Sequence, residues 1–122
     1  MIGYVTLGTN DLPRAVAFYD RLFESIGGSR ILEQERSVAW GFGPTAAAFG
    51  VIRPFDGKPA TVGNGVMVSL AMTTPAKVDT LYRLALSLGA TDEGAPGERG
   101  DRIYAAYFRD LDGNKLMIFF MK

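Results

Sequence analysis

The chain carries one pattern twice, at a constant offset of 63 positions, as from Val5 to Val68. In each copy an apolar run typical of a strand precedes a capped amphipathic helix that ends in glycine. A repeated unit usually needs its twin to complete a core, so the repeat predicts two related modules with a concave space between them, and we expect function there. The matched pairs are Val5 and Val68, Leu7 and Leu70, Asp11 and Thr74, and Tyr19 and Tyr82.

Composition narrows the possible functions. The 122 residues, 48% of them hydrophobic, predict one domain with a sizeable core. Thirteen basic residues balance thirteen acidic ones, so nothing predicts binding to nucleic acid. No apolar run approaches the ~20 residues that cross a bilayer, and no signal peptide is apparent, so we expect a cytoplasmic protein that does not bind membranes. The absence of Cys and His excludes thiolate nucleophiles, disulfides and the commonest metal ligands.

The first half predicts a β-α-β-β-β order. Its strands are expected at 2–8, 30–33, 38–42 and 47–53, with a helix that starts near Asp11 and ends before Gly27. Module one is therefore assigned to residues 1–54, followed by a Pro- and Gly-rich linker at 55–64.

The second half, module two at 65–122, repeats the order of the first. A strand at 66–72 precedes a helix from Thr74 to Gly89, and strands at 102–109 and 115–121 flank a turn at 110–114. The segment 94–100 holds three glycines and a proline and predicts a loop. The last two runs are so apolar that we expect burial on both faces or a subunit contact.

Three segments resemble the vicinal oxygen chelate superfamily, which includes glyoxalase I, bleomycin-resistance proteins and extradiol dioxygenases. They are Val5 to Leu12, Ala17 to Tyr19, and the ending Tyr104 to Leu116, which reads YAAYFRDLDGNKL where the family usually has proline at Leu111. The resemblance implies an α+β fold of two tandem βαβββ modules that form an incompletely closed eight-stranded barrel, commonly in a homodimer.

The resemblance also implies where a metal ion would bind in metal-dependent members. Carried over residue by residue, the ligand positions are Tyr4, Gly50, Met67 and Met117. A thioether is too soft for the Lewis-acid metal of such enzymes, glycine offers no side chain, and a neutral phenol is a poor donor. We therefore predict no metal ion or other cofactor in this site.

A site without its metal would present a largely apolar cavity. Its predicted ligand-binding residues are Tyr4, Trp40, Met67, Tyr104 and Met117, with Phe42 and Tyr107 nearby. Such a lining suits a flat or apolar small molecule, but the same side chains could also simply fill the space. Arg36, Arg53 and Arg109 are candidate anchors for an anion, although composition favours the surface for any one of them.

Two classes of function remain open. The leading hypothesis is a dimeric member of the superfamily that binds a small organic molecule without metal. The alternative is a lyase, isomerase or dioxygenase with a non-standard metal site, or one in which Tyr4 beside an arginine acts as general acid or base without a metal. The one close carboxylate pair, Asp110 and Asp112, is better explained as a turn whose side chains cap backbone amides.

Overall fold

The computed structural model describes all 122 residues, which form two compact units, Met1–Val62 and Gly63–Lys122. The boundary between the units falls inside the linker predicted at 55–64. Whether the two units behave as one domain stays a prediction.

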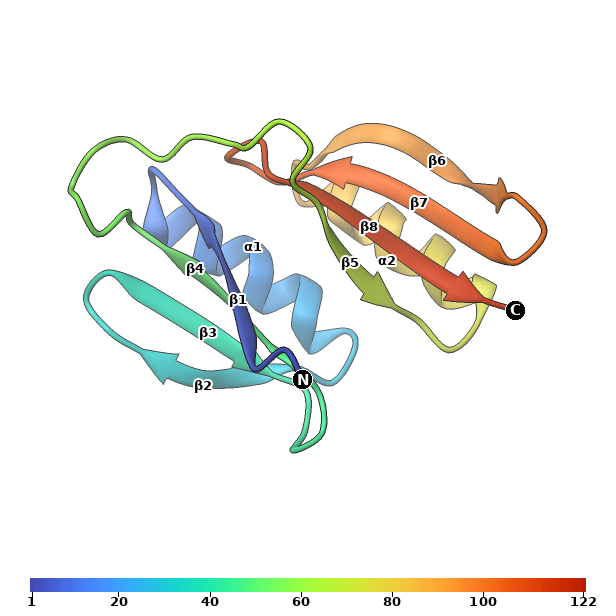
Figure 1. Cartoon of the computed structure of the whole chain (residues 1–122), viewed down its shortest axis with the longest axis horizontal. Coiled ribbons are helices and arrows are strands. Elements are labelled where there is room, and N and C mark those ends of the chain that lie inside the picture. Colours follow the sequence, from blue (N-terminus) through green and yellow to red (C-terminus); the bar gives the residue numbers. More distant parts are fainter. The chain divides into compact units, whose positions relative to one another are not determined.

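The first unit is an open four-stranded sheet with one helix on one face (Figure 1). The strands lie in the order β1-β4-β3-β2, with β1 parallel to β4 and the other neighbours antiparallel. The elements are β1 (Tyr4–Gly8), α1 (Leu12–Glu24), β2 (Ser29–Glu33), β3 (Ser37–Gly41) and β4 (Ala48–Ile52).

Helix α1 begins and ends where its capping residues predict. The Asp11 carboxylate accepts a hydrogen bond from the Arg14 amide at 3.1 Å, and Pro13 lies in the first turn, where a missing N–H costs nothing. Past the last turn Gly27 has φ +84°, a conformation that glycine adopts without strain. The buried stripe that packs on the sheet is Leu12, Ala15, Phe18, Tyr19, Leu22 and Phe23.

The second unit has the same plan. Its strands lie in the order β5-β8-β7-β6, with β5 parallel to β8, and helix α2 packs on one face of the sheet (Figure 1). The elements are β5 (Val68–Ala71), α2 (Pro75–Ser87), β6 (Thr91–Arg99), β7 (Ile103–Arg109) and β8 (Lys115–Met121).

The predicted repeat is confirmed at the level of individual residues. Each helix has 13 residues, and Leu12 and Pro75, their first residues, are 63 positions apart. Thr6 pairs with Gly50 in the first sheet, and Ser69, its repeat equivalent, pairs with Met117 in the second. The α+β fold with two βαβββ units is therefore the predicted one. Neither helix is long and apolar enough to span a membrane.

The loop predicted at 94–100 is wrong. Strand β6 runs through this segment, pairs with β7 alone, and ends at Arg99. Two irregularities in the register, around Gly94 and before Gly97, accommodate the segment, and Pro96 is tolerated because an edge strand does not need every N–H. The glycines therefore allow a bulged edge strand rather than a loop.

Each sheet has one face covered by its own helix and one face turned away from that helix, here called the open face. In the first unit, rings of α1 pack against Trp40 of β3 and Phe49 of β4. In the second unit, the hydroxyl of Tyr104 on β7 donates to Asp79 of α2. Because side chains alternate along a strand, the neighbours of these residues lie on the open faces.

Candidate functional site

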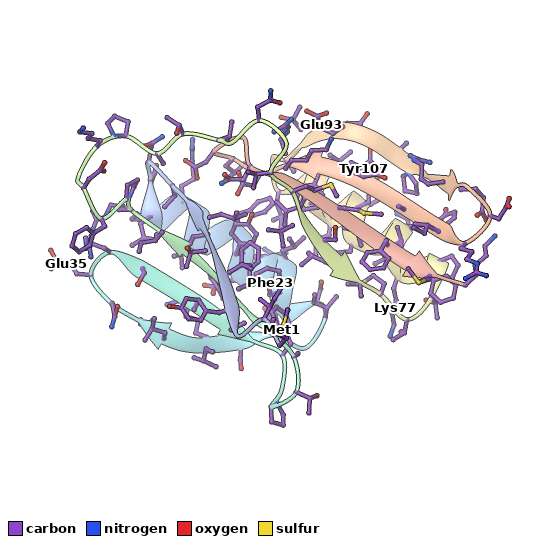
Figure 2. The ribbon with its side chains drawn as sticks, viewed as in Figure 1. Met1, Phe23, Glu35, Lys77, Glu93 and Tyr107 are labelled. Atoms are coloured by element: carbon purple, nitrogen blue, oxygen red, sulfur yellow. The ribbon has the colours of Figure 1, made fainter.

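The open face of the second sheet carries large apolar side chains that α2 does not cover. Tyr107 of β7 lies opposite Met117 of β8, and Ala105 lies opposite Phe119. On the other side of Met117, Ser69 of β5 donates a hydrogen bond to its sulfur at 3.5 Å. Tyr107, Met117 and Phe119 are each only half-buried. The labels of Figure 2 place Tyr107 on this sheet, with Glu93 near the same end.

Two cations lie against the Tyr107 ring. The guanidinium carbon of Arg99, at the end of β6, lies 5.5 Å from the ring centroid. The ammonium of Lys115, at the start of β8, lies at the same distance of 5.5 Å. Both residues share the open face because Arg99 pairs with Ile103 and Lys115 precedes Met117 by two positions. These distances are those of favourable cation–π contacts.

An ion pair borders this group. Arg109 Nε lies 2.7 Å from Glu93 Oε1, and the same guanidinium donates to the Gly113 carbonyl at 3.1 Å. The hydrogen bond and charge of Arg109 hold the pKa of Glu93 below its ordinary value, and the charge of Lys115 adds to this effect. Arg109 therefore reaches the open face, but its charge is already partnered.

The other two arginines predicted as anion anchors lie elsewhere, in the first unit. Arg53 donates to the Glu35 carbonyl at 2.6 Å, and the Arg36 guanidinium lies 5.1 Å from the centroid of the Phe55 ring. Both residues are exposed near the turn that joins β2 and β3. They do not join the group around Tyr107.

Two of the five predicted ligand-binding residues lie on the helix side of their sheets. Trp40 is only 1% exposed, packs between rings of α1, and donates from Nε1 to Asp20 at 2.9 Å. Tyr104 donates to Asp79 at 2.6 Å, and this bond raises the pKa of the phenol. Both are therefore parts of a helix–sheet contact and do not accompany Met117 on the open face.

The remaining three predicted residues lie on or beside open faces. Met67 directly precedes β5 and is 40% exposed, and Met117 lies two strands from the edge strand β6. Tyr4 begins β1 in the first unit and is 69% exposed. Because side chains alternate along a strand, Trp40 and Tyr104 lie on a different face of their sheets from these three residues. The sequence does not show which of the two faces of a sheet the helix covers.

The four positions where the resemblance places metal ligands do not fit a metal. The registers make Gly50 the counterpart of Met117, and the repeat offset makes Tyr4 the counterpart of Met67. No hard anionic or imidazole donor is present at any of the four. No group of three carboxylates that could hold a metal ion forms anywhere in the 122 residues.

The turn between β7 and β8 uses its carboxylate for capping, as predicted. Asp110 Oδ1 accepts from the amides of Asp112 and Asn114, each at 2.9 Å, and Oδ2 accepts from the Asn114 side chain at 3.0 Å. Asp110 is only 5% exposed. Its role is to hold the turn that sets the register of the β7–β8 pair.

Sequence reasoning missed Arg99 and Lys115. Lys115 could have been found, because it precedes Met117 by two positions and so shares its face of the strand. Arg99 was hidden by the glycines around it, which predicted a loop. Only the pairing of β6 with β7 brings it to Tyr107.

Comparison with known proteins agrees with this architecture. A family model described as the glyoxalase/bleomycin resistance protein/dioxygenase superfamily matches residues 1–118. A crystal structure of a glyoxalase/bleomycin resistance protein from Albidiferax ferrireducens T118 is 32% identical, with a TM-score of 0.90, over 100% of this chain and 99% of that one.

Two further structures show the same fold at lower identity. A family enzyme from Burkholderia phytofirmans PsJN is 21% identical over 98% of each chain, with a TM-score of 0.80. A lactoylglutathione lyase from Agrobacterium tumefaciens is 22% identical over 98% of this chain and 92% of that one, with a TM-score of 0.75. No curated protein matches the chain. The family model and the 32% identical structure establish that this chain belongs to the glyoxalase/bleomycin resistance protein/dioxygenase superfamily.

Proposed function

We propose that this protein binds a small organic molecule on the open face of its second sheet. The observation that carries the proposal is the group formed by Tyr107, Met117 and Phe119, three large apolar side chains on a face that α2 does not cover. A contiguous apolar surface of this kind is costly in water and usually marks a contact with a ligand or partner.

The side chains on this face suit a flat ligand. Tyr107 offers an aromatic ring for stacking, and Met117 is polarizable and adapts its shape to neighbouring groups. Ser69 and the charged neighbours of Tyr107 supply the few polar groups that orient a molecule on an apolar floor. The site thus has the mixture of apolar area and limited polarity that is typical of small-molecule sites.

Membership of the family is compatible with binding alone. The family description itself joins glyoxalases and dioxygenases with a resistance protein. The residues at the metal-ligand positions, Tyr4, Gly50, Met67 and Met117, favour a role that does not use the family's usual metal.

A thermal-shift screen of aromatic and amphipathic compounds tests the proposal. We expect some compounds to raise the Tm of the wild type, because a ligand that binds only the folded state stabilises it. Met117→Glu should abolish the shift by placing a charge on the apolar floor, whereas Ile31→Glu should retain it. Ile31 is a matched control because it is an exposed apolar residue on a strand of the first unit.

Two results would overturn the proposal. One is the absence of any shift across a broad compound library in the wild type. The other is a stoichiometric metal ion in the purified protein whose removal abolishes an activity, because this would favour an enzyme with a non-standard metal site. A homodimer, implied by family resemblance, is a separate proposal that light scattering of the same preparation tests.

A further inference from the structure

We infer that the ligand is an organic carboxylate, whose anionic group binds between Arg99 and Lys115 while its apolar body lies over Met117 and Phe119. This inference rests on the proposed binding function and adds the chemical class of the ligand. Its basis is the charge, the backbone packing and the apolar neighbours of the Tyr107 ring.

The first argument is the balance of charge on the open face. The carboxylate next to these cations on this face, Glu93, is already paired with Arg109 at 2.7 Å. Glu98 pairs with Lys122 at 2.8 Å and, opposite Tyr104 in the register, lies on the helix side. Arg99 donates only to backbone carbonyls, those of residues 95 and 98, and forms no ion pair. Lys115 forms no ion pair either. The ring thus has two cations beside it that form no ion pair, although the charge of Lys115 also acts on Glu93.

Such an arrangement favours an anion. The two cations reach the Tyr107 ring from the strands on either side of β7, and an anion bound at the ring beside them offsets their positive charge while it gains charge-assisted hydrogen bonds. Arg99 can hold both oxygens of a carboxylate, and Lys115 adds a point charge. Both side chains are half-buried, so their attraction for an anion is screened less than at a fully exposed site.

The second argument is that two glycines allow Arg99 to lie across β6. A Cβ atom at Gly94 would lie 2.9 Å from Tyr107 Cδ2 and 3.5 Å from a terminal nitrogen of Arg99. A Cβ atom at Gly97 would lie 3.0 Å from the other terminal nitrogen. With no side chain at either position, ring and guanidinium pack against the strand backbone. The cation is held in place before a ligand arrives, which lowers the entropic cost of binding.

The third argument is the distance from the charges to the apolar floor. Ala105 and its partner Phe119 lie two residues along the strands from Tyr107 and Met117, a step of roughly 7 Å. A carboxylate joined to one or two rings spans this length. Ala105 is completely buried, so Phe119 forms the surface at this end, and an aromatic body fits it better than a second charge would.

The test compares carboxylates with neutral analogues. Benzoate, 3-phenylpropionate and 2-naphthoate, and the corresponding alcohols, are titrated by calorimetry into wild type, Arg99→Met, Lys115→Met and Lys77→Met. Met keeps the length of each side chain and removes its charge. Lys77 is the matched control because it is exposed on α2 and donates to the Thr73 hydroxyl.

We expect at least one carboxylate to bind the wild type about tenfold more tightly than its alcohol, since a charged hydrogen bond is worth that much or more. Arg99→Met and Lys115→Met should each remove most of this preference and leave binding of the alcohol unchanged, while Lys77→Met should change neither. The preference should also weaken as salt rises from about 50 mM to about 500 mM.

The outcomes separate the inference from the proposed function. If alcohols bind as tightly as carboxylates, or if the two Met variants keep the preference, the carboxylate assignment is overturned and binding on the open face stands. If no compound of either kind binds the wild type, both are overturned. Should Arg99→Met lose secondary structure by circular dichroism, Lys115→Met alone decides the matter.

Discussion

The two units share a chain order, a helix length and a sheet topology, yet they differ in the side chains that their open faces carry. In the first unit the rings of Tyr19, Phe23, Trp40 and Phe49 form one cluster between helix and sheet, with centroids 4.9 to 5.8 Å apart. The centre of its open face is occupied by Gly50 and so has no large side chain. A Cβ atom added at Gly50 would lie only 3.3 Å from the Val38 carbonyl oxygen.

In the second unit the helix side mixes aromatic and aliphatic groups, among them Phe108, Ile118 and Val78, which are completely buried. The position equivalent to Gly50 is Met117, and it lies on the open face with Tyr107. A duplicated unit can therefore keep its backbone plan while its two copies carry different side chains on their open faces.

The largest expected effect of this difference concerns helix positions 23 and 86, which the repeat makes equivalent. Phe23 is completely buried against four other rings, whereas Leu86 is half-buried. Phe23→Ala should lower the free energy of unfolding by about 3 to 5 kcal/mol because it opens a large cavity, and Leu86→Ala by about 1 to 2 kcal/mol. Urea denaturation measures both. Equal losses would show that the two cores are packed alike.

A smaller effect is expected at Asp20, a charged residue that contacts the aromatic core of the first unit. Asp20 accepts from Trp40 Nε1 at 2.9 Å and from Arg30 Nε at 2.9 Å, and the Arg30 hydrogen bond is the largest cause that lowers the Asp20 pKa below 3.8. Asp20→Asn should cost about 1 kcal/mol, a value kept small because the carboxylate is partly exposed to solvent. Arg83→Gln, at the equivalent position of the second unit, should change stability by less than about 0.5 kcal/mol.

The Asp20 contribution has a defined pH dependence. Because its pKa is lowered in the folded state, the carboxylate stabilises the protein fully above about pH 4, and this stabilisation is lost as pH falls through the lowered pKa. The difference between wild type and Asp20→Asn should therefore shrink on acidification. A difference in unfolding free energy that stays constant down to acid pH would contradict this assignment.

The sequence predicted most of the fold because the repeat acts through local signals. Caps, apolar periodicity and the helix-ending glycines lie within each unit, so Asp11 and Thr74 mark helix starts without knowledge of the rest. The prediction for β6 was wrong because this strand depends on its pairing with β7, and rules that use only neighbouring residues do not include that partner. Trp40 and Met117 were placed in one predicted site for the same reason: periodicity puts each on a definite face, but only the packing of the helices decides which face is open.

A comparable polar contact in the second unit gives a third, smaller effect. The hydroxyl of Tyr82 donates to Asp92 at 2.8 Å, and burial together with this carboxylate raises the pKa of the phenol. Tyr82→Phe should cost about 1 kcal/mol at neutral pH. Because the pKa is raised in the fold, the wild-type advantage is complete below about pH 10 and lost as pH rises through the raised value. Chemical denaturation at neutral and alkaline pH measures this, and an advantage that persists into strong alkali would contradict it.

The smallest effect is expected at Met117, where the two faces of one strand can be compared directly. Ile118 is completely buried on the helix side, while Met117 is half-buried on the open face. Ile118→Ala should lower the free energy of unfolding by about 2 to 5 kcal/mol, and Met117→Ala by less than about 1 kcal/mol, because truncation on an uncovered face removes little packing. Urea denaturation distinguishes the two. A loss at Met117 as large as that at Ile118 would mean that this face is packed in the folded protein, and its side chains would then serve stability instead of a ligand.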